Sequence, residues 1–197
     1  MDKPDSWVVH KFGGSSVADA DCFRKVAAIL EAAPPGRLGV VLSACKGVTD
    51  ALLRLVALAE RQDEGYHAEI VQLRSRHAAI ATAVLSRAAA QQYLASFDQD
   101  CLDVEGILHA VKLTRAAARN VSDLVAGYGE VWSSRLFQRF LSERAQRPGP
   151  VQWLDARRVL IVEWDPLGPV IQWPEARERL APRCRRIFAA RWSSPAS

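Results

Sequence analysis

The sequence predicts an α/β fold in which a mostly parallel sheet is sandwiched by helices. Strand and helix patterns alternate over residues 7–60, and residues 38–42 form an almost continuous apolar run. Alternating elements are typical of parallel sheets with right-handed crossovers, and unbroken apolar strands are typical of strands buried on both faces. A third observation is the alanine-rich segment of residues 66–120, whose periodicity predicts two or three helices that form a layer or lid.

The first predicted strand, residues 7–10, is expected to be buried, and it leads into a glycine-rich loop. Because glycine has no Cβ, backbone N–H groups can approach a ligand closely, and N–H groups at a helix start attract anions. A lysine adds positive charge and a serine adds a hydroxyl donor. The candidate phosphate-binding residues are Lys11, Phe12, Gly13, Gly14 and Ser15. A plain strand-to-helix turn would use the same residue types, so the loop alone leaves both interpretations open.

An amphipathic helix is predicted after this loop, because apolar residues recur at helical spacing from Phe23 to Leu30 before a Pro-Pro-Gly sequence ends the pattern. The next strand, residues 38–42, leads into a loop of small residues, 43–47, and Thr49 is the expected N-cap of another helix. In a parallel sheet both loops follow the carboxyl ends of their strands, where ligands bind. Two such loops favour a binding site at this edge.

The titratable residues within residues 66–120 are interpreted as structural. The acidic residues are expected at a helix start and on a solvated face, and the histidines are expected at the surface or at helix caps. These residues are Asp98, Asp100, Asp103, Glu105, His67, His77 and His109. No metal-ligand spacing connects them, so no metal site is predicted.

Two glycines, Gly127 and Gly129, predict a turn that places Glu130 at the start of the following helix. The apolar stripe from Trp132 to Phe140 supports that helix. Two interpretations of Glu130 stay open at this point. An acid in the first helical turn is stabilised by the helix dipole, whereas a carboxylate in a binding site could accept hydrogen bonds from a substrate ammonium group.

The C-terminal part of the chain is rich in arginine. A break at residues 147–150 precedes a predicted short strand, residues 151–154, and a helix over residues 175–190. The arginines of this helix are Arg177, Arg179, Arg183, Arg185 and Arg186. We interpret them as a solvated face whose apolar neighbours pack inward. The alternative is a non-catalytic interaction or regulatory module that contacts a partner through this basic helix.

The length and composition of the chain limit the classes of protein to which it can belong. The 197 residues suit one domain, or one domain with a tail, and 49% hydrophobic residues allow a sizeable core. The net charge of +4 fits an anionic small molecule, whereas the basic residues are too scattered for nucleic acid binding. The four cysteines show no Cys-x-x-Cys spacing, so neither zinc nor a disulfide framework is predicted. Without an apolar run of about 18 residues or a signal-peptide core, we expect a cytoplasmic protein that does not contact membranes.

Three stretches taken together resemble the aspartokinases of the amino acid kinase family: residues 11–19, residues 41–50 and residues 129–136. Residues 151–157 also resemble the strand that follows in that family. The stretches occur in the family's order and with similar spacing. The resemblance implies the amino acid kinase fold and a reaction in which ATP and L-aspartate give ADP and 4-phospho-L-aspartate. This reaction is the first step of lysine, threonine and methionine biosynthesis.

The resemblance also implies roles for individual residues. Lys11 would stabilise the transferring phosphoryl group, while Gly13 and Gly14 would supply backbone donors. The aspartate would be held by Ser43, Thr49 and Glu130, with the glutamate on its α-ammonium group. ATP would bring Mg²⁺ with it. A carboxylate nucleophile is already ionised at neutral pH and needs no general base.

The chain departs from the family's pattern in one respect. Aspartokinases continue into a Gly-Arg-Gly-Gly-Ser-Asp sequence, a nucleotide-binding half and ACT regulatory domains, none of which occurs in these residues. We therefore expect residues 1–197 to be the N-terminal, amino-acid-binding part of the kinase domain and to be inactive alone. Fusion to ACT domains or to another enzyme of the pathway, assembly into a homo-oligomer, and a family kinase for glutamate or a carbamate stay open as alternatives.

Overall fold

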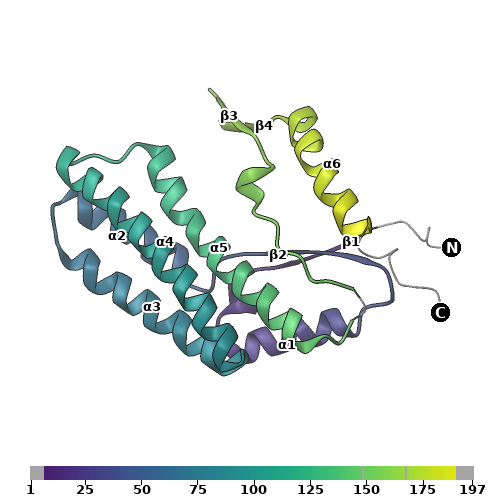
Figure 1. Cartoon of the computed structure of the whole chain (residues 1–197). Coiled ribbons are helices and arrows are strands. Elements are labelled where there is room, and N and C mark those ends of the chain that lie inside the picture. The colour runs from purple at the N-terminus through teal and green to yellow at the C-terminus, as the bar shows by residue number, and fades with distance from the viewer. Residues whose placement is uncertain (1–6, 148, 167, 190–197) are drawn as a thin grey trace. The chain divides into compact units, whose positions relative to one another are not determined.

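Figure 1 shows the chain as a computed structural model, which describes residues 7–147, 149–166 and 168–189. The chain divides into two compact units, Met1–Gln146 and Arg147–Ser197, and each is described by itself. The first unit opens with two parallel strands connected through a helix, so the predicted α/β fold is confirmed.

The parallel pair and its connection are built from four elements: β1 (Trp7–Phe12), η1 (Gly14–Val17, a 3-10 turn), α1 (Ala20–Glu31) and β2 (Arg37–Leu42). In the register of the pair, Phe12 lies opposite Leu42, so the two strands end side by side. Asp19 is the N-cap of α1 and accepts a hydrogen bond from the backbone N–H of Cys22 at 2.9 Å. The predicted amphipathic helix is therefore confirmed. Because the two strands end side by side, the loops after them meet at one edge.

The predicted burial of the two strands is wrong. Val8, Val9 and Val41 are 51%, 63% and 50% exposed. Within the described residues, β1 and β2 pair only with each other, so much of their apolar surface meets solvent. An apolar run shows that a strand can be buried on two faces, but it does not supply the elements that would cover it.

Four helices pack side by side next to the strands (Figure 1): α2 (Val48–Glu60), α3 (Gly65–Val84), α4 (Arg87–Thr114) and α5 (Arg119–Arg144). Two of them, α3 and α4, account for the helices predicted over residues 66–120. We call these four helices the helical layer. Its largest fully buried side chains include Leu52, Leu55, Tyr93, Phe97, Trp132 and Leu136. Burying a large apolar side chain contributes about 1.5–3 kcal/mol, so this core accounts for much of the unit's stability.

The predicted turn at Gly127 and Gly129 is wrong, because α5 runs through both glycines without interruption. Packing explains the second glycine. A Cβ at Gly129 would lie 2.7 Å from the Cβ of Ala44 and 3.3 Å from a methyl group of Val48. A Cβ at Gly127 would meet nothing within 4 Å. Gly129 therefore lets α5 approach the loop after β2 and the start of α2, and it does not mark a break in the helix.

The expected helix start is wrong for all four acidic residues, because Asp98, Asp100, Asp103 and Glu105 lie in the interior of α4. The expected surface positions are wrong for Asp100 and His77. Asp100 lies inside α4, where it pairs with Arg135 at 2.7 Å and accepts a hydrogen bond from the indole N–H of Trp132 at 3.1 Å. His77 is fully buried, with its ring 4.8 Å from that of Phe97. Burial lowers the pKa of His77 to about 4, so the ring is neutral at pH 7. These contacts join consecutive helices of the layer, α4 to α5 at Asp100 and α3 to α4 at His77.

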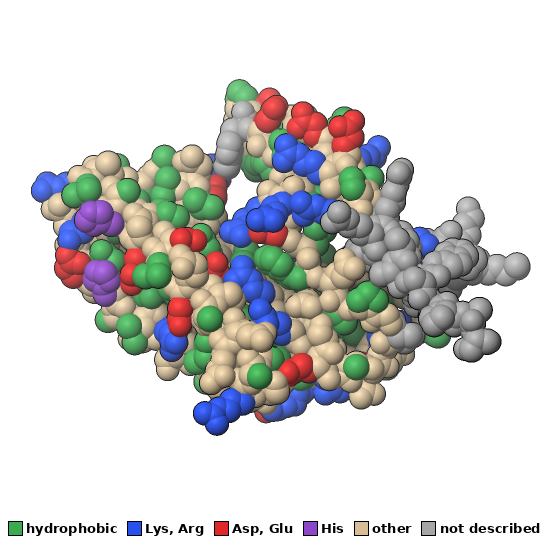
Figure 2. Space-filling view, in the orientation of Figure 1, with side chains coloured by type: hydrophobic (Ala, Val, Ile, Leu, Met, Phe, Trp, Pro, Cys, Tyr) green, Lys and Arg blue, Asp and Glu red, His purple; other side chains and the backbone are tan. Residues whose placement is uncertain are grey.

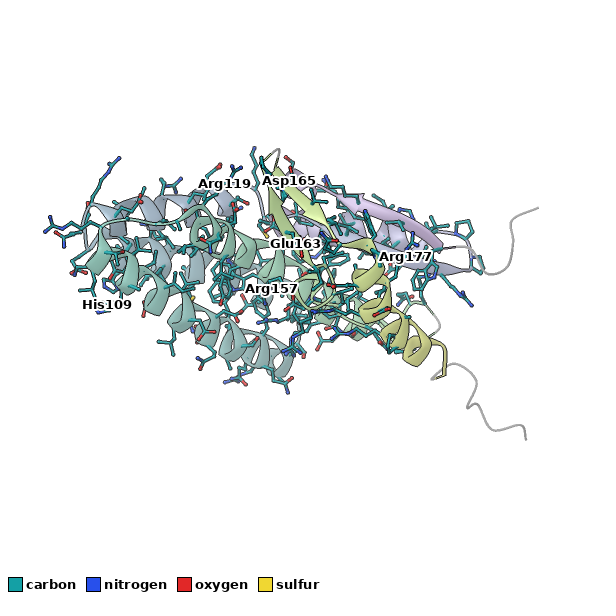
Figure 3. The ribbon with its side chains drawn as sticks, turned by 90° about the horizontal axis from the view of Figure 1, so that it is seen from above. His109, Arg119, Arg157, Glu163, Asp165 and Arg177 are labelled. Atoms are coloured by element: carbon teal, nitrogen blue, oxygen red, sulfur yellow. The ribbon has the colours of Figure 1, made fainter. Side chains whose placement is uncertain are left out.

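The remaining histidines of the layer lie at its surface as predicted. His67 and His109 are exposed, and His67 lies 3.2 Å from a carboxylate oxygen of Glu64. Figure 2 shows histidine side chains (purple) beside acidic ones (red) on the surface of the helical layer, and Figure 3 labels His109 on α4. Glu64 also forms an ion pair with Lys112. These groups face solvent, where such pairs contribute little to stability.

The second unit contains η2 (Ala156–Arg158), β3 (Val162–Asp165), β4 (Gly168–Ile171) and α6 (Trp173–Ala189). The strands form an antiparallel hairpin, and Figure 3 labels Glu163 and Asp165 on β3. The strand predicted at residues 151–154 is wrong, because these residues have no strand conformation in the structure. The strands that do form lie farther along, and β4 begins at Gly168, whose φ is +127°.

The predicted C-terminal helix corresponds to α6. Arg177 and Arg179 are exposed on it, in agreement with a solvated arginine face. The side chains of residues 184–189, which include Arg185 and Arg186, lie outside the described residues, as does that of Trp164. None of the helices described for this chain combines the length and the hydropathy needed to cross a lipid bilayer.

Candidate active site

The candidate site forms where the loops after β1 and β2 meet. The backbone N–H of Ser43 donates to the carbonyl of Phe12 at 3.0 Å, and the backbone N–H of Lys46 donates to the carbonyl of Gly14 at 3.1 Å. These two bonds continue the strand pairing into the loops. They bring the predicted phosphate-binding residues next to Ser43, the first of the predicted aspartate-binding residues.

The two glycines of the first loop have different structural roles. A Cβ at Gly14 would lie 2.8 Å from the carbonyl oxygen of Ala44, so only glycine allows the two loops to approach this closely. A Cβ at Gly13 would meet nothing within 4 Å, and its backbone is extended at φ −77° and ψ 171°. The exposed side of Gly13 is therefore open to a ligand, whereas Gly14 holds the loops together.

The helix α5 supplies the third part of the site. The Oε1 atom of Glu130 lies 3.4 Å from the backbone N–H of Ala44, at the edge of hydrogen-bonding distance. Glu130 lies in the middle of α5 and not in its first turn, so the helix-dipole interpretation is wrong. Its position instead places a carboxylate against the loop that follows β2.

Ser133 is a site residue that the sequence analysis missed. Its side chain is buried, and its Oγ donates to the carbonyl of Ser43 at 2.8 Å. The signal was present in the spacing, because residues three apart on a helix share a face and Ser133 follows Glu130 by three. Ser133 therefore anchors the loop after β2 to the same helical face that presents Glu130.

The sequence predicts that Thr49 is the N-cap of α2, and this prediction is wrong. The N-cap is Gly47, at a φ of +77° that favours glycine, and Thr49 is half-buried in the first turn of the helix. Among the described residues, no hydrogen bond joins the Thr49 hydroxyl to Ser43 or Glu130. The structure therefore brings Ser43 and Glu130 to one loop and places Thr49 just after it.

The charges of the site are divided between its parts. Lys11 and Lys46 are exposed on the two loops, and Glu130 is exposed on α5. A cation beside backbone N–H groups suits an anionic ligand, and a carboxylate suits an ammonium group. The loop also contains Cys45, which is buried, and burial raises the pKa of its thiol to about 11. Cys45 is therefore not a thiolate nucleophile at neutral pH.

Known proteins match this arrangement in sequence and in structure. The model of the amino acid kinase family matches residues 6–186. The chloroplastic bifunctional aspartokinase/homoserine dehydrogenase 1 of Arabidopsis thaliana is 33% identical over 163 residues. The lysine-sensitive aspartokinase 3 of Escherichia coli is 34% identical over 153 residues. A crystal structure of Escherichia coli aspartokinase III in complex with aspartate and ADP superposes with a TM-score of 0.77 and 29% identity over 94% of this chain.

These relatives are much longer than the chain. The matched region is 82% of this chain but 18% of the Arabidopsis protein, and 78% of this chain but 32% of the Escherichia coli aspartokinase 3. In the structural match, the chain covers 39% of its counterpart. The similarity therefore confirms the predicted fold and family resemblance over a part of each relative.

Proposed function

Because this chain belongs to the amino acid kinase family, we propose that it forms the amino-acid-binding part of an aspartate kinase. The reaction would transfer the terminal phosphoryl group of ATP to the side-chain carboxylate of L-aspartate, giving ADP and 4-phospho-L-aspartate. The observation that carries the proposal is the meeting of three separate elements, the loops after β1 and β2 and the face of α5, through the hydrogen bonds of Ser43.

The proposed substrate contacts follow from the chemistry of the groups at the site. Glu130 would accept hydrogen bonds from the aspartate ammonium group, because a carboxylate beside the loop attracts a cation. The hydroxyl groups of Ser43 and Thr49 would orient the substrate carboxylates. This assignment explains why an acidic residue lies in the middle of α5, against a loop in which it also approaches the N–H of Ala44.

The proposed phosphoryl contacts involve the first loop. A carboxylate oxygen of aspartate would attack the terminal phosphorus while the bond to the bridging oxygen of ADP breaks. The nucleophile is ionised at neutral pH, so the protein contributes by positioning and by neutralising charge rather than by removing a proton. Lys11 would stabilise the transferring group, with backbone N–H groups of the loop Phe12–Ser15 beside it.

We assign Mg²⁺ to the nucleotide and not to this chain. Among the described residues, no group of three His, Cys, Asp or Glu side chains could hold a metal ion. When bound with ATP, Mg²⁺ neutralises phosphate charge. The longer relatives carry sequence beyond the matched region, and we propose that residues of that kind supply most of the nucleotide site. The 197 residues alone would then bind aspartate without turning it over.

The experiment is an isothermal titration of L-aspartate into the chain and into Glu130→Gln. The affinity of Glu130→Gln should fall at least tenfold, because the substrate ammonium loses its charged partner. Asp123→Asn is the matched control: it neutralises another exposed acid on α5, outside the site, and should leave the affinity unchanged. Equal affinities for the chain and for Glu130→Gln would contradict the proposed role of Glu130. Rapid formation of aspartyl phosphate by the 197 residues with ATP would contradict the proposed need for further sequence.

A further inference from the structure

A cavity of ≈ 250 Å³ lies between α2 and α3, separate from the candidate active site. One face of α2 contributes Arg54, and Gly47 lies at the start of that helix. One face of α3 contributes Glu69, Gln72 and Arg76. None of these residues belongs to the proposed substrate contacts. We propose that this cavity is a second small-molecule site, which binds a free amino acid with an acidic side chain.

One carboxylate oxygen of Glu69 has no partner in the part of the chain that the structure describes. The Oε1 atom of Glu69 accepts a hydrogen bond from the Nε of Arg54 at 3.3 Å. The Oε2 atom of Glu69 is buried and has no hydrogen-bond partner among the described residues. Leaving a buried polar atom unpaired is unfavourable, and the penalty is removed when a donor arrives. If the Glu69 carboxylate turns into the cavity, an ammonium group of a ligand there would provide that donor.

The charged side chains that line the cavity carry a net positive charge. Arg54 and Arg76 contribute two positive charges to the cavity walls, and Glu69 contributes one negative charge. A guanidinium group binds carboxylates through paired hydrogen bonds. A ligand with one ammonium group and two carboxylates would satisfy Glu69 and both arginines. Cavities for drug-sized ligands span about 300–1,000 Å³, so this smaller one suits a free amino acid.

Two residues that line the cavity, Arg76 and Gly47, connect it to the two loops of the candidate active site. The Nη2 of Arg76 donates to the carbonyl of Ala18 at 3.1 Å, and Ala18 follows directly after η1, the turn of the first loop. Gly47, at the edge of the cavity, ends the second loop and caps α2. A ligand that engages Arg76 therefore bears on both loops, and any coupling between the two sites is reciprocal. This coupling rests on the proposed function, whereas binding in the cavity does not.

The test is an NMR titration of the ¹⁵N-labelled chain with L-glutamate. Glutarate is the matched probe, because it has both carboxylates and no ammonium group. We expect L-glutamate to shift the amide signals of residues 69–76 and the side-chain amide of Gln72, with glutarate binding at least tenfold more weakly. Absence of shifts in residues 69–76 would overturn the proposal.

Substitutions of the cavity arginines test whether L-glutamate binds in the cavity. Arg76→Gln should weaken L-glutamate binding at least tenfold, whereas Arg74→Gln, a matched change on the same helix whose side chain pairs with Asp98, should not. Arg54→Gln, at an exposed position, provides a second cavity variant should Arg76→Gln fail to fold. Equal affinity in the folded cavity variants and in the unaltered chain would overturn the proposal.

The Glu130→Gln variant separates the two proposals. If L-glutamate still shifts residues 69–76 in Glu130→Gln, the cavity is a site of its own. If Glu130→Gln abolishes those shifts, the ligand belongs to the candidate active site and the second site is overturned. A chain in which L-glutamate shifts residues 69–76, but in which L-aspartate leaves the amide signals of Ser43 and Glu130 unshifted, would refute the proposed function and leave the cavity site intact.

Discussion

The helical layer and the loop edge of the first unit are stabilised in different ways. In the layer, large side chains such as Phe97 and Trp132 are buried and a half-buried ion pair joins Asp100 to Arg135. At the loop edge, backbone hydrogen bonds and two close approaches at glycine hold the chain, and the charged side chains face solvent. The residues that stabilise the first unit are therefore different from those that face a ligand. The four predictions below test that separation.

The largest effect is expected at Lys11, on turnover and not on stability. In a protein that contains this chain and forms aspartyl phosphate, Lys11→Ala should lower kcat by about a hundredfold or more, because one stabiliser of developing charge is lost. The melting temperature should stay constant, since Lys11 is exposed. Lys46→Ala on the neighbouring loop is the comparison variant and should cost less. A normal kcat for Lys11→Ala would sink the role assigned to Lys11.

The next largest effect is a pH-dependent loss of stability that originates in the helical layer. The folded chain holds the pKa of His77 at about 4, below the reference value of 6.5 expected on unfolding. Between these values the unfolded chain binds a proton that the folded chain does not. The stability contribution is therefore complete above pH 6.5 and is lost as the pH falls to 4, by about 3 kcal/mol in total.

Urea unfolding at pH 7, 6 and 5 measures this loss. The free energy of unfolding should fall less steeply in His77→Gln than in the unaltered chain, because glutamine does not titrate. His109→Gln replaces an exposed histidine of α4 and should keep the full dependence (Figure 3). If all three proteins lose the same free energy, the pH response does not come from His77.

Gly129 lies where α5 contacts the loop after β2, so replacing it should affect both stability and aspartate binding. Gly129→Ala places a Cβ 2.7 Å from that of Ala44, so α5 or the loop after β2 must shift. Overpacking of this kind costs about 1–3 kcal/mol, offset by about 1 kcal/mol of helix propensity. We expect a lower melting temperature and weaker L-aspartate binding. Gly127→Ala has open space and should gain stability without changing affinity, so similar behaviour of the two variants would contradict the packing argument.

The smallest effect is expected at Ser133. Removing its hydroxyl in Ser133→Ala breaks the 2.8 Å bond to the carbonyl of Ser43 and should lower stability by about 1 kcal/mol. The loop then loses an anchor, so the KM for aspartate should rise more than kcat falls. Ser134→Ala removes a hydroxyl that bonds back to the carbonyl of Glu130 at 2.6 Å within the same helix, and its KM should be unchanged. A KM that rises equally in both variants would mean that the anchor has no special role.

The sequence predicts what depends on neighbouring residues and misses what depends on distant ones. The order of strands and helices up to Glu60 follows from local spacing and from caps such as Asp19. The prediction of a turn at Gly129 is wrong because this glycine is needed for close packing against Ala44, which lies on the loop after β2. The buried environment of His77 depends likewise on Phe97 and Trp132, from two other helices.

The candidate site also contains residues that the sequence predicts and residues that only the packing of distant elements explains. The loop Phe12–Ser15 and Ser43 were predictable, because the carboxyl ends of parallel strands meet at one edge. The anchoring by Ser133 and the central position of Glu130 in α5 required the packing of α5 against the second loop. The functional roles of Lys11, Thr49 and Glu130 stay predictions until the variants are measured.

The buried thiol of Cys45 has a chemical consequence for the proposed reaction. The product, an acyl phosphate, is a reactive mixed anhydride that a neighbouring thiolate would capture as a thioester. The loop holds a cysteine beside the place where that anhydride would form, yet burial raises its pKa to about 11 and keeps the sulfur protonated. The same burial shields Cys45 from alkylating reagents and from oxidants, which act on the thiolate. The loop can therefore use Cys45 as a small, apolar residue for packing, and the acyl phosphate product does not acylate its thiol.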